Sequence, residues 1–205
     1  MNQIIHNFKE SLEVGSGGER LIESFIWTLP SIKKVENVSG VEKYRAKDID
    51  FVVTTTQDDI VTYELKTEPT AYYTGNFFYE YVCNVEKKTP GCFIFSEADY
   101  WMSFIPQSGM LYVFPLIEYR EYVLESAKNF NLISVYNQGK QTRGKVLKIS
   151  DVCNNIRHNV RNIRDFADYD YIEAVSRTSS SPARDSEFKN VIWKNNIPQN
   201  TDSEL

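Results

Sequence analysis

The sequence predicts an α/β fold in which a mixed sheet is flanked by helices. Residues 51–56 and 60–66 are rich in β-branched and aromatic side chains, and the turn-forming residues 57–59 separate them, which is typical of a β-hairpin. A helix-like segment precedes this hairpin, and strand-like and helix-like segments follow it. A chain that mixes both kinds of element in this way favours helices packed on a sheet.

The leading helix is predicted from an apolar stripe at helical spacing, formed by Leu21, Ile22, Phe25, Ile26 and Leu29. Pro30 ends the run. Ser16 is expected to be the N-cap, and Glu19, three positions later, completes a capping box. Glu19 also borders the apolar stripe, so the sequence leaves two roles open for it: the cap alone, or a site on the buried side of the helix.

Further elements are expected after the helix. Residues 67–76 have the composition of a loop, and residues 77–82 suit either a strand or a helix. Pro115 suits the first position of a helix that runs to about residue 128. Strands are predicted at residues 32–38, 91–95 and 110–114.

Length and composition bound the type of protein. The 205 residues, 41% hydrophobic and 14% aromatic, suit one domain with a sizeable core, expected over residues 1–175, with a polar, flexible tail at 176–205. There is no run of the roughly 20 apolar residues that a membrane-spanning helix needs, and no signal peptide pattern. The three cysteines form no C-x-x-C pair, which favours reduced thiols. A soluble cytoplasmic protein with no membrane partner is expected.

The charge distribution points to one basic segment. The net charge of −5 argues against a general polyanion binder, but residues 139–164 hold seven basic residues and one acidic residue. Asp151 is expected to begin a helix over residues 151–166. This segment is expected either to follow DNA phosphates or to be the solvated face of an amphipathic helix, and its candidate DNA contacts are Lys140, Arg143, Arg157, Arg161 and Arg164.

The candidate site lies on the hairpin. Asp50 stands at the start of the first strand, and Glu64 and Lys66 at the end of the second point to one face because strand side chains alternate. Two carboxylates and an amine suit a hard divalent cation beside a positive charge. Asp48 has the same strand parity as Asp50, so periodicity leaves the choice between them open, and Asp50 is preferred because it leads directly into the apolar run. The alternative to a metal site is an ordinary surface hairpin, in which a Glu–Lys ion pair stabilises the fold by under ~1 kcal/mol.

Glu19 on the leading helix, Asp50, and Glu64-x-Lys66 together resemble the PD-(D/E)XK nuclease superfamily, which includes restriction enzymes, Holliday-junction resolvases and phage-type nucleases. The resemblance covers about residues 15–95. The order helix–strand–strand–strand is similar to the start of that superfamily's αβββαβ core, so a restriction-endonuclease-like fold is expected. One departure is that Ile49 stands where the superfamily often has a proline.

The resemblance implies a metal-dependent endonuclease that hydrolyses DNA phosphodiester bonds. Asp50, Glu64 and Glu19 would hold Mg²⁺ or Mn²⁺, helped by the backbone carbonyl of Leu65. Lys66 would position or activate the attacking water.

Other residues and partners follow from the same resemblance. Asp48 is the reserve ligand, and Asn76 and Glu80 are expected to face the site from the next element. The expected substrates include branched DNA and the DNA of phages or mobile elements, and a homodimer is one expected form. The alternative is a nuclease-fold module that binds DNA or a protein partner without cutting.

Overall fold

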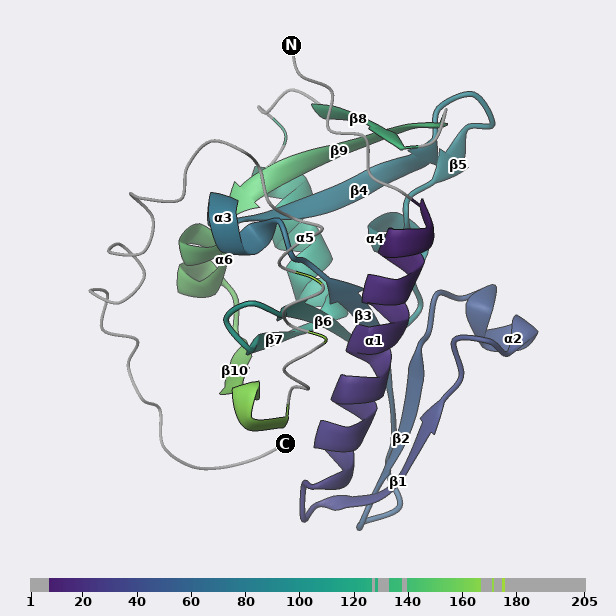
Figure 1. The fold of residues 1–205 in the computed structure, drawn as a ribbon, viewed down its shortest axis with the longest axis vertical. Coiled ribbons are helices and arrows are strands. Elements are labelled where there is room, and N and C mark those ends of the chain that lie inside the picture. The colour runs from purple at the N-terminus through teal and green to yellow at the C-terminus, as the bar shows by residue number, and fades with distance from the viewer. Residues whose placement is uncertain are drawn as a thin grey trace.

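The chain forms two β-sheets and several helices in a computed structural model, which describes residues 8–126, 128, 133–137, 140–166, 171 and 175. Figure 1 shows the larger sheet in the lower half of the view, with α1 (Phe8–Trp27) in front of it, and the smaller sheet across the top. The short helices α2 (Glu42–Arg45), α3 (Ala71–Thr74) and α4 (Cys92–Phe95) connect strands. The remaining helical elements are α5 (Leu116–Ser126), α6 (Ile149–Asn155) and η2 (Arg164–Phe166).

The larger sheet is mixed. Its six strands lie in the order β1 (Ile32–Asn37), β2 (Phe51–Thr55), β3 (Ile60–Thr67), β6 (Tyr100–Ile105), β7 (Met110–Pro115) and β10 (Asn159–Asn162). Every neighbouring pair is antiparallel except β3 and β6, which run parallel. A parallel pair needs a crossover, and the chain between β3 and β6 makes one with α3, α4 and two strands of the other sheet.

The smaller sheet is antiparallel throughout. Its strands lie in the order β5 (Thr89–Pro90), β4 (Asn76–Asn84), β9 (Lys140–Lys148) and β8 (Ile133–Asn137). The sequence did not predict this sheet, because its two central strands are some sixty residues apart in the chain.

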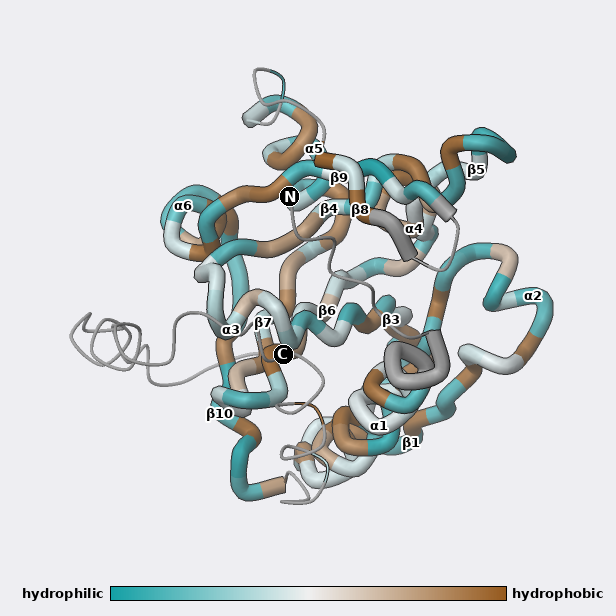
Figure 2. The backbone as a smooth tube through the Cα atoms, turned by 45° about the horizontal axis from the view of Figure 1, so that its top comes forward, coloured by the Kyte–Doolittle hydropathy of each residue, from teal (hydrophilic) through white to brown (hydrophobic). Residues whose placement is uncertain are grey.

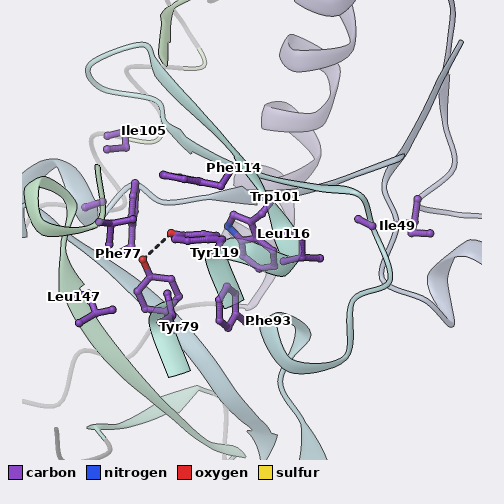
Figure 3. Close-up of a cluster of buried hydrophobic side chains, with 14 of the residues drawn as sticks. Ile49, Phe77, Tyr79, Phe93, Trp101, Ile105, Phe114, Leu116, Tyr119 and Leu147 are labelled. Atoms are coloured by element: carbon purple, nitrogen blue, oxygen red, sulfur yellow. Dashed lines mark hydrogen bonds between the residues drawn. The ribbon is translucent and has the colours of Figure 1, made fainter. Parts of the chain in front are cut away.

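The larger sheet has an apolar cluster on each face. On one face Phe51, Val53 and Leu65 pack with the apolar stripe of α1. On the other face Val52, Trp101 and Phe114 of the larger sheet join side chains of the smaller sheet and of α5, including Phe77, Tyr79, Leu116 and Tyr119. Figure 3 shows part of this second cluster, and Figure 2 shows hydrophobic residues, in brown, along α1 and several strands. Because Leu65 faces α1, its neighbours Glu64 and Lys66 lie on the opposite face.

The predicted α/β class, with a mixed sheet and flanking helices, is confirmed, as are strands at β1, β2, β3 and β7 and a helix after Pro115. No helix in the described part of the chain has the length and apolar character to cross a membrane. Residues 176–205, where a tail was expected, lie outside the described residues.

The predicted N-cap at Ser16 is wrong. Helix α1 already begins at Phe8, and the Ser16 hydroxyl donates a hydrogen bond to the Glu13 carbonyl inside the helix, 3.3 Å away. A Cβ at Gly17 would overlap the Tyr171 ring, and one at Gly18 would overlap the Thr67 hydroxyl. The glycines therefore permit close packing of α1 rather than begin a helix.

Two predicted elements are of the wrong type. Residues 91–95 contain the short helix α4 instead of a strand. The helix expected over residues 151–166 ends at Asn155, with Asp151 inside it rather than at its cap, and residues 159–162 form β10. The exposed edge of β7 accepts this segment as a strand, in the register Val160↔Tyr112, and its apolar spacing suits either element.

Candidate functional site

Asp50 and Glu64 face each other across the β2–β3 hairpin. The register that pairs Phe51 with Tyr63 places Asp50 opposite Glu64. The Asp50 N–H donates to the Tyr63 carbonyl at 2.9 Å, and the Asp50 carboxylate accepts the Leu65 N–H at 2.9 Å. The hairpin therefore fixes both the backbone and the side chain of Asp50 beside Glu64.

Asp48 also reaches Glu64, although not by strand geometry. Its φ of 53° is in the left-handed region, so strand parity does not apply to it. The Ser96 hydroxyl donates to the Asp48 carbonyl at 2.9 Å, which ties this bend to the segment after α4. The sequence left open whether Asp48 or Asp50 is the ligand, and in the structure both lie close to Glu64.

The three carboxyls are crowded and poorly solvated. Burial raises the pKa of Asp48 and that of Asp50 from 3.8 to about 6. Burial, and then the charges of Asp50 and Asp48, raises the pKa of Glu64 well above its ordinary value. Within the described residues, Glu64 Oε2 and Asp48 Oδ2 are buried and accept no hydrogen bond. Carboxyls whose pKa is raised in this way are unfavourable as neighbouring anions, and a cation placed among them would offset their repulsion.

Lys66 lies beside these acids as a cation. Its pKa is raised above the ordinary lysine value, first by the negative charge that Cys92 carries when ionised. The carboxylates of Glu68, Glu80 and Glu64 act in the same direction, against the effect of burial. An ammonium held in this way donates hydrogen bonds and supplies charge, and it does not act as a base at neutral pH.

Glu19 lies next to Asp50, at the edge of the acids. Its charge raises the pKa of Asp50. One of its oxygens, Oε2, accepts hydrogen bonds from the Ser39 hydroxyl at 2.8 Å and from the Asn37 amide at 3.1 Å. The first turn after β1 therefore orients the glutamate that α1 contributes.

The two residues expected from the next element differ. Glu80 in β4 acts electrostatically on Asp48, Lys66 and Cys92, so it belongs to the cluster. The Asn76 amide instead donates to the Thr74 carbonyl at 2.9 Å, where it closes the turn after α3.

Sequence reasoning missed Glu68 and Cys92. Glu68 continues the alternation of Glu64 and Lys66, so strand parity could have found it. Cys92 is the first residue of α4, and no local pattern relates it to the hairpin. Burial raises the pKa of the Cys92 thiol to about 12, with Lys66 opposing, so the thiol is protonated at neutral pH.

A close backbone approach at Gly91 brings Cys92 to the site. The Gly91 N–H donates to the Tyr81 carbonyl at 2.9 Å, and a Cβ at Gly91 would overlap the Glu80 carbonyl. Gly91→Ala is expected to destabilise the protein by about 1 to 3 kcal/mol through overpacking, measured by urea denaturation. Gly40→Ala, where a Cβ meets nothing within 4 Å, is the matched control, and equal stability of the two variants would contradict the expectation.

The predicted DNA-contacting residues do not form one helical stripe. Arg157 pairs with Glu118 at 3.2 Å, Arg161 is exposed on β10, and Arg164 donates to the Gln107 carbonyl at 3.1 Å. Strand β10 is three strands from β3, roughly 14 Å at the usual strand spacing. Arg143 is exposed on β9, and Lys140 begins that strand.

Among the described residues, no three His, Cys, Asp or Glu side chains already surround one point as metal ligands do. Comparison with protein-family models, curated proteins and solved structures finds no match to this chain.

Proposed function

We propose that this chain is a metal-dependent endonuclease that hydrolyses DNA phosphodiester bonds, of the PD-(D/E)XK type. The observation that carries the proposal is the convergence of Asp48, Asp50 and Glu64, three poorly solvated carboxyls, beside the ammonium of Lys66. Buried like charges are unfavourable unless a cation or proton compensates them. A site that tolerates such crowding suits a divalent cation.

The order of elements supports the same proposal. Helix α1 is followed by the β1–β2–β3 meander, and β6 then returns parallel to β3, the order that the resemblance implies. The departure is the crossover, in which α3, β4, β5 and α4 take the place of one long helix.

The donor set fits Mg²⁺ or Mn²⁺, because carboxylate oxygens are the ligands that hard cations prefer. Asp50 and Glu64 would hold the ion, with Asp48, Glu19 and the Leu65 carbonyl as further oxygen donors. When bound, the ion supplies a water of lowered pKa and neutralises phosphate charge.

Lys66 has a separate role in this proposal. Because its pKa is raised, it stays an ammonium that orients the attacking water or a phosphate oxygen by donating hydrogen bonds. The general base is therefore another group.

The test is cleavage of linear, nicked and branched DNA with Mg²⁺ or Mn²⁺. Asp50→Asn and Glu64→Gln are each expected to lower the cleavage rate more than about a hundredfold, since even outer partners of metal ligands contribute 10–100-fold. Glu121→Gln, at an exposed position on α5, is the control. Metal-dependent cleavage that persists in both site variants would overturn the proposal.

The second candidate is a module that binds DNA or a protein partner without cutting. It is favoured by the raised pKa of Glu64, which burial causes, and by the fact that no three His, Cys, Asp or Glu side chains among the described residues are arranged to hold an ion. Calorimetry with Mn²⁺ separates the two candidates. The endonuclease takes up the ion and loses that uptake in Glu64→Gln, whereas a binding module forms its complex with no such uptake.

A further inference from the structure

We propose that Arg120 of α5 is a positioning residue for the acid site, because it holds the chain segment on which the Asp48 bend rests. That segment, residues 93–97, runs from α4 to the residue after its C-cap and is called the α4 segment below. Arg120 acts through backbone carbonyls and a serine hydroxyl, not by contact with an ion or with DNA. The inference deepens the proposed function, and only its consequence for the metal rests on that function.

The Arg120 guanidinium binds the α4 segment at two points. Its Nε donates to the Phe93 carbonyl at 2.9 Å, and its Nη2 donates to the Ser96 carbonyl at 2.6 Å. Both carbonyls belong to the C-terminal end of a short helix, where carbonyls lack partners within the helix and a positive charge is favourable. Because a planar guanidinium fixes its donors relative to each other, the two bonds set the orientation of the α4 segment as well as its position.

The hydrogen bonds to the α4 segment are the contacts that satisfy the Arg120 side chain. Arg120 is half-buried and forms no ion pair within 4.0 Å in the part of the chain that the structure describes. A poorly solvated guanidinium is unfavourable unless its donors are bound. Tyr119, its neighbour in α5, packs on the Phe93 ring with the centroids 5.5 Å apart (Figure 3). Helix α5 therefore holds the α4 segment by its backbone as well as by its core side chain.

The α4 segment in turn holds the Asp48 bend at two points. The Ser96 hydroxyl donates to the Asp48 carbonyl at 2.9 Å, and the Glu97 N–H donates to the Lys47 carbonyl at 2.8 Å. Ser96 is 2% exposed, so water has little access to its bond. The φ of 53° at Asp48 lies in a region that L residues adopt at a cost, and contacts from outside the bend stabilise it there. Arg120 therefore sets the position of Asp48 through Ser96 and Glu97.

The experiment measures hydrogen exchange of single backbone amides by NMR, on the full chain without metal or DNA. Arg120→Met keeps an unbranched side chain and removes the donors. The Glu97 amide should then exchange about tenfold faster relative to the Ile163 amide, because loss of a charged donor loosens the α4 segment locally. The Ile163 N–H, which donates to the Gly109 carbonyl at 2.8 Å, is the internal reference. Glu121→Met, at an exposed position of the same helix, is the control and should leave the ratio of the two rates unchanged.

An unchanged ratio of exchange rates in folded Arg120→Met would overturn the inference, because a residue that only stabilises the whole fold affects both amides alike. If Arg120→Met fails to fold, Arg120→Lys decides. Its single ammonium lacks the two fixed donors of the guanidinium, so a faster relative exchange of the Glu97 amide supports positioning, and an unchanged ratio overturns it.

A double-mutant cycle tests the route from Arg120 to the acids, with Mn²⁺ affinity measured by calorimetry. Arg120→Met and Ser96→Ala are each expected to weaken Mn²⁺ binding about tenfold, as outer partners of metal ligands do. Because both changes act on Asp48 through the same contact, the double variant should lose no more affinity than the weaker-binding single variant. Additive losses would overturn the route through Ser96. If the unmodified chain binds no Mn²⁺, the proposed function fails, while hydrogen exchange still decides whether Arg120 holds the α4 segment.

Discussion

Asp50→Asn is expected to stabilise the protein by about 1 to 3 kcal/mol above pH 7, although the same change removes a proposed metal ligand. The amide retains an oxygen that can accept the Leu65 N–H, as the carboxylate does at 2.9 Å. Its NH₂ group can donate to Glu64, whereas two carboxylates repel each other. The substitution therefore keeps the local geometry and removes a poorly solvated charge.

The stability gained by Asp50→Asn should increase with pH. The folded-state pKa of Asp50 is about 6, against an ordinary value of 3.8, so the folded state retains a proton that the unfolded chain releases. The destabilisation caused by Asp50 is absent below about pH 4, grows as the pH rises from about 4 to 6, and is constant above that. Urea denaturation at pH 4 and pH 8 should show little difference between Asp50→Asn and the unmodified chain at the lower pH and the full gain at the higher.

The matched control for this expectation is Asp59→Asn, at an exposed position in the β2–β3 turn. Its stability should equal that of the unmodified chain at both pH values, within the small range usual for surface changes. A loss of stability in Asp50→Asn at pH 8 would mean that the Asp50 charge is already compensated in the folded protein, and the crowding argument for a cation site would fail.

The hairpin part of the site was accessible from the sequence because short-range rules govern it. A short connection fixes which residues of two strands face each other, and alternation then places Asp50, Glu64 and Lys66 on one side. Asp48 could not be resolved by the same rule, since a left-handed φ of 53° takes it out of the strand.

Long-range contacts decided what the sequence could not. The segment 159–162 has apolar spacing that suits a helix, but the edge of β7 offers it backbone hydrogen bonds. Cys92 reaches Lys66 because Gly91 lets its backbone approach that of Glu80. The local sequence contains no pattern that would indicate either the pairing with β7 or the close approach of Gly91 to Glu80.

Phe93→Ala is expected to produce the largest loss of stability, about 3 to 5 kcal/mol, as is typical of removing a buried aromatic ring. Phe93 is 0% exposed. Its ring centroid lies 4.9 Å from that of Tyr79, 5.2 Å from that of Trp101 and 5.5 Å from that of Tyr119. These three residues belong to the smaller sheet, the larger sheet and α5, so one ring joins three elements (Figure 3).

The matched control is Phe95→Ala on the same short helix, where the ring is 38% exposed and the expected loss is about 1 kcal/mol. Urea denaturation measures both losses, and comparable values would contradict the role given to Phe93. Helix α4 also carries Cys92, and Ser96 after it holds the carbonyl of Asp48. Loss of the Phe93 ring should therefore loosen the acids as well as the core, so Phe93→Ala should lower Mn²⁺ affinity under conditions where the variant is still folded, while Phe95→Ala should not. The second sheet, which no local sequence pattern predicted, would then support the position of Asp48 through this aromatic contact.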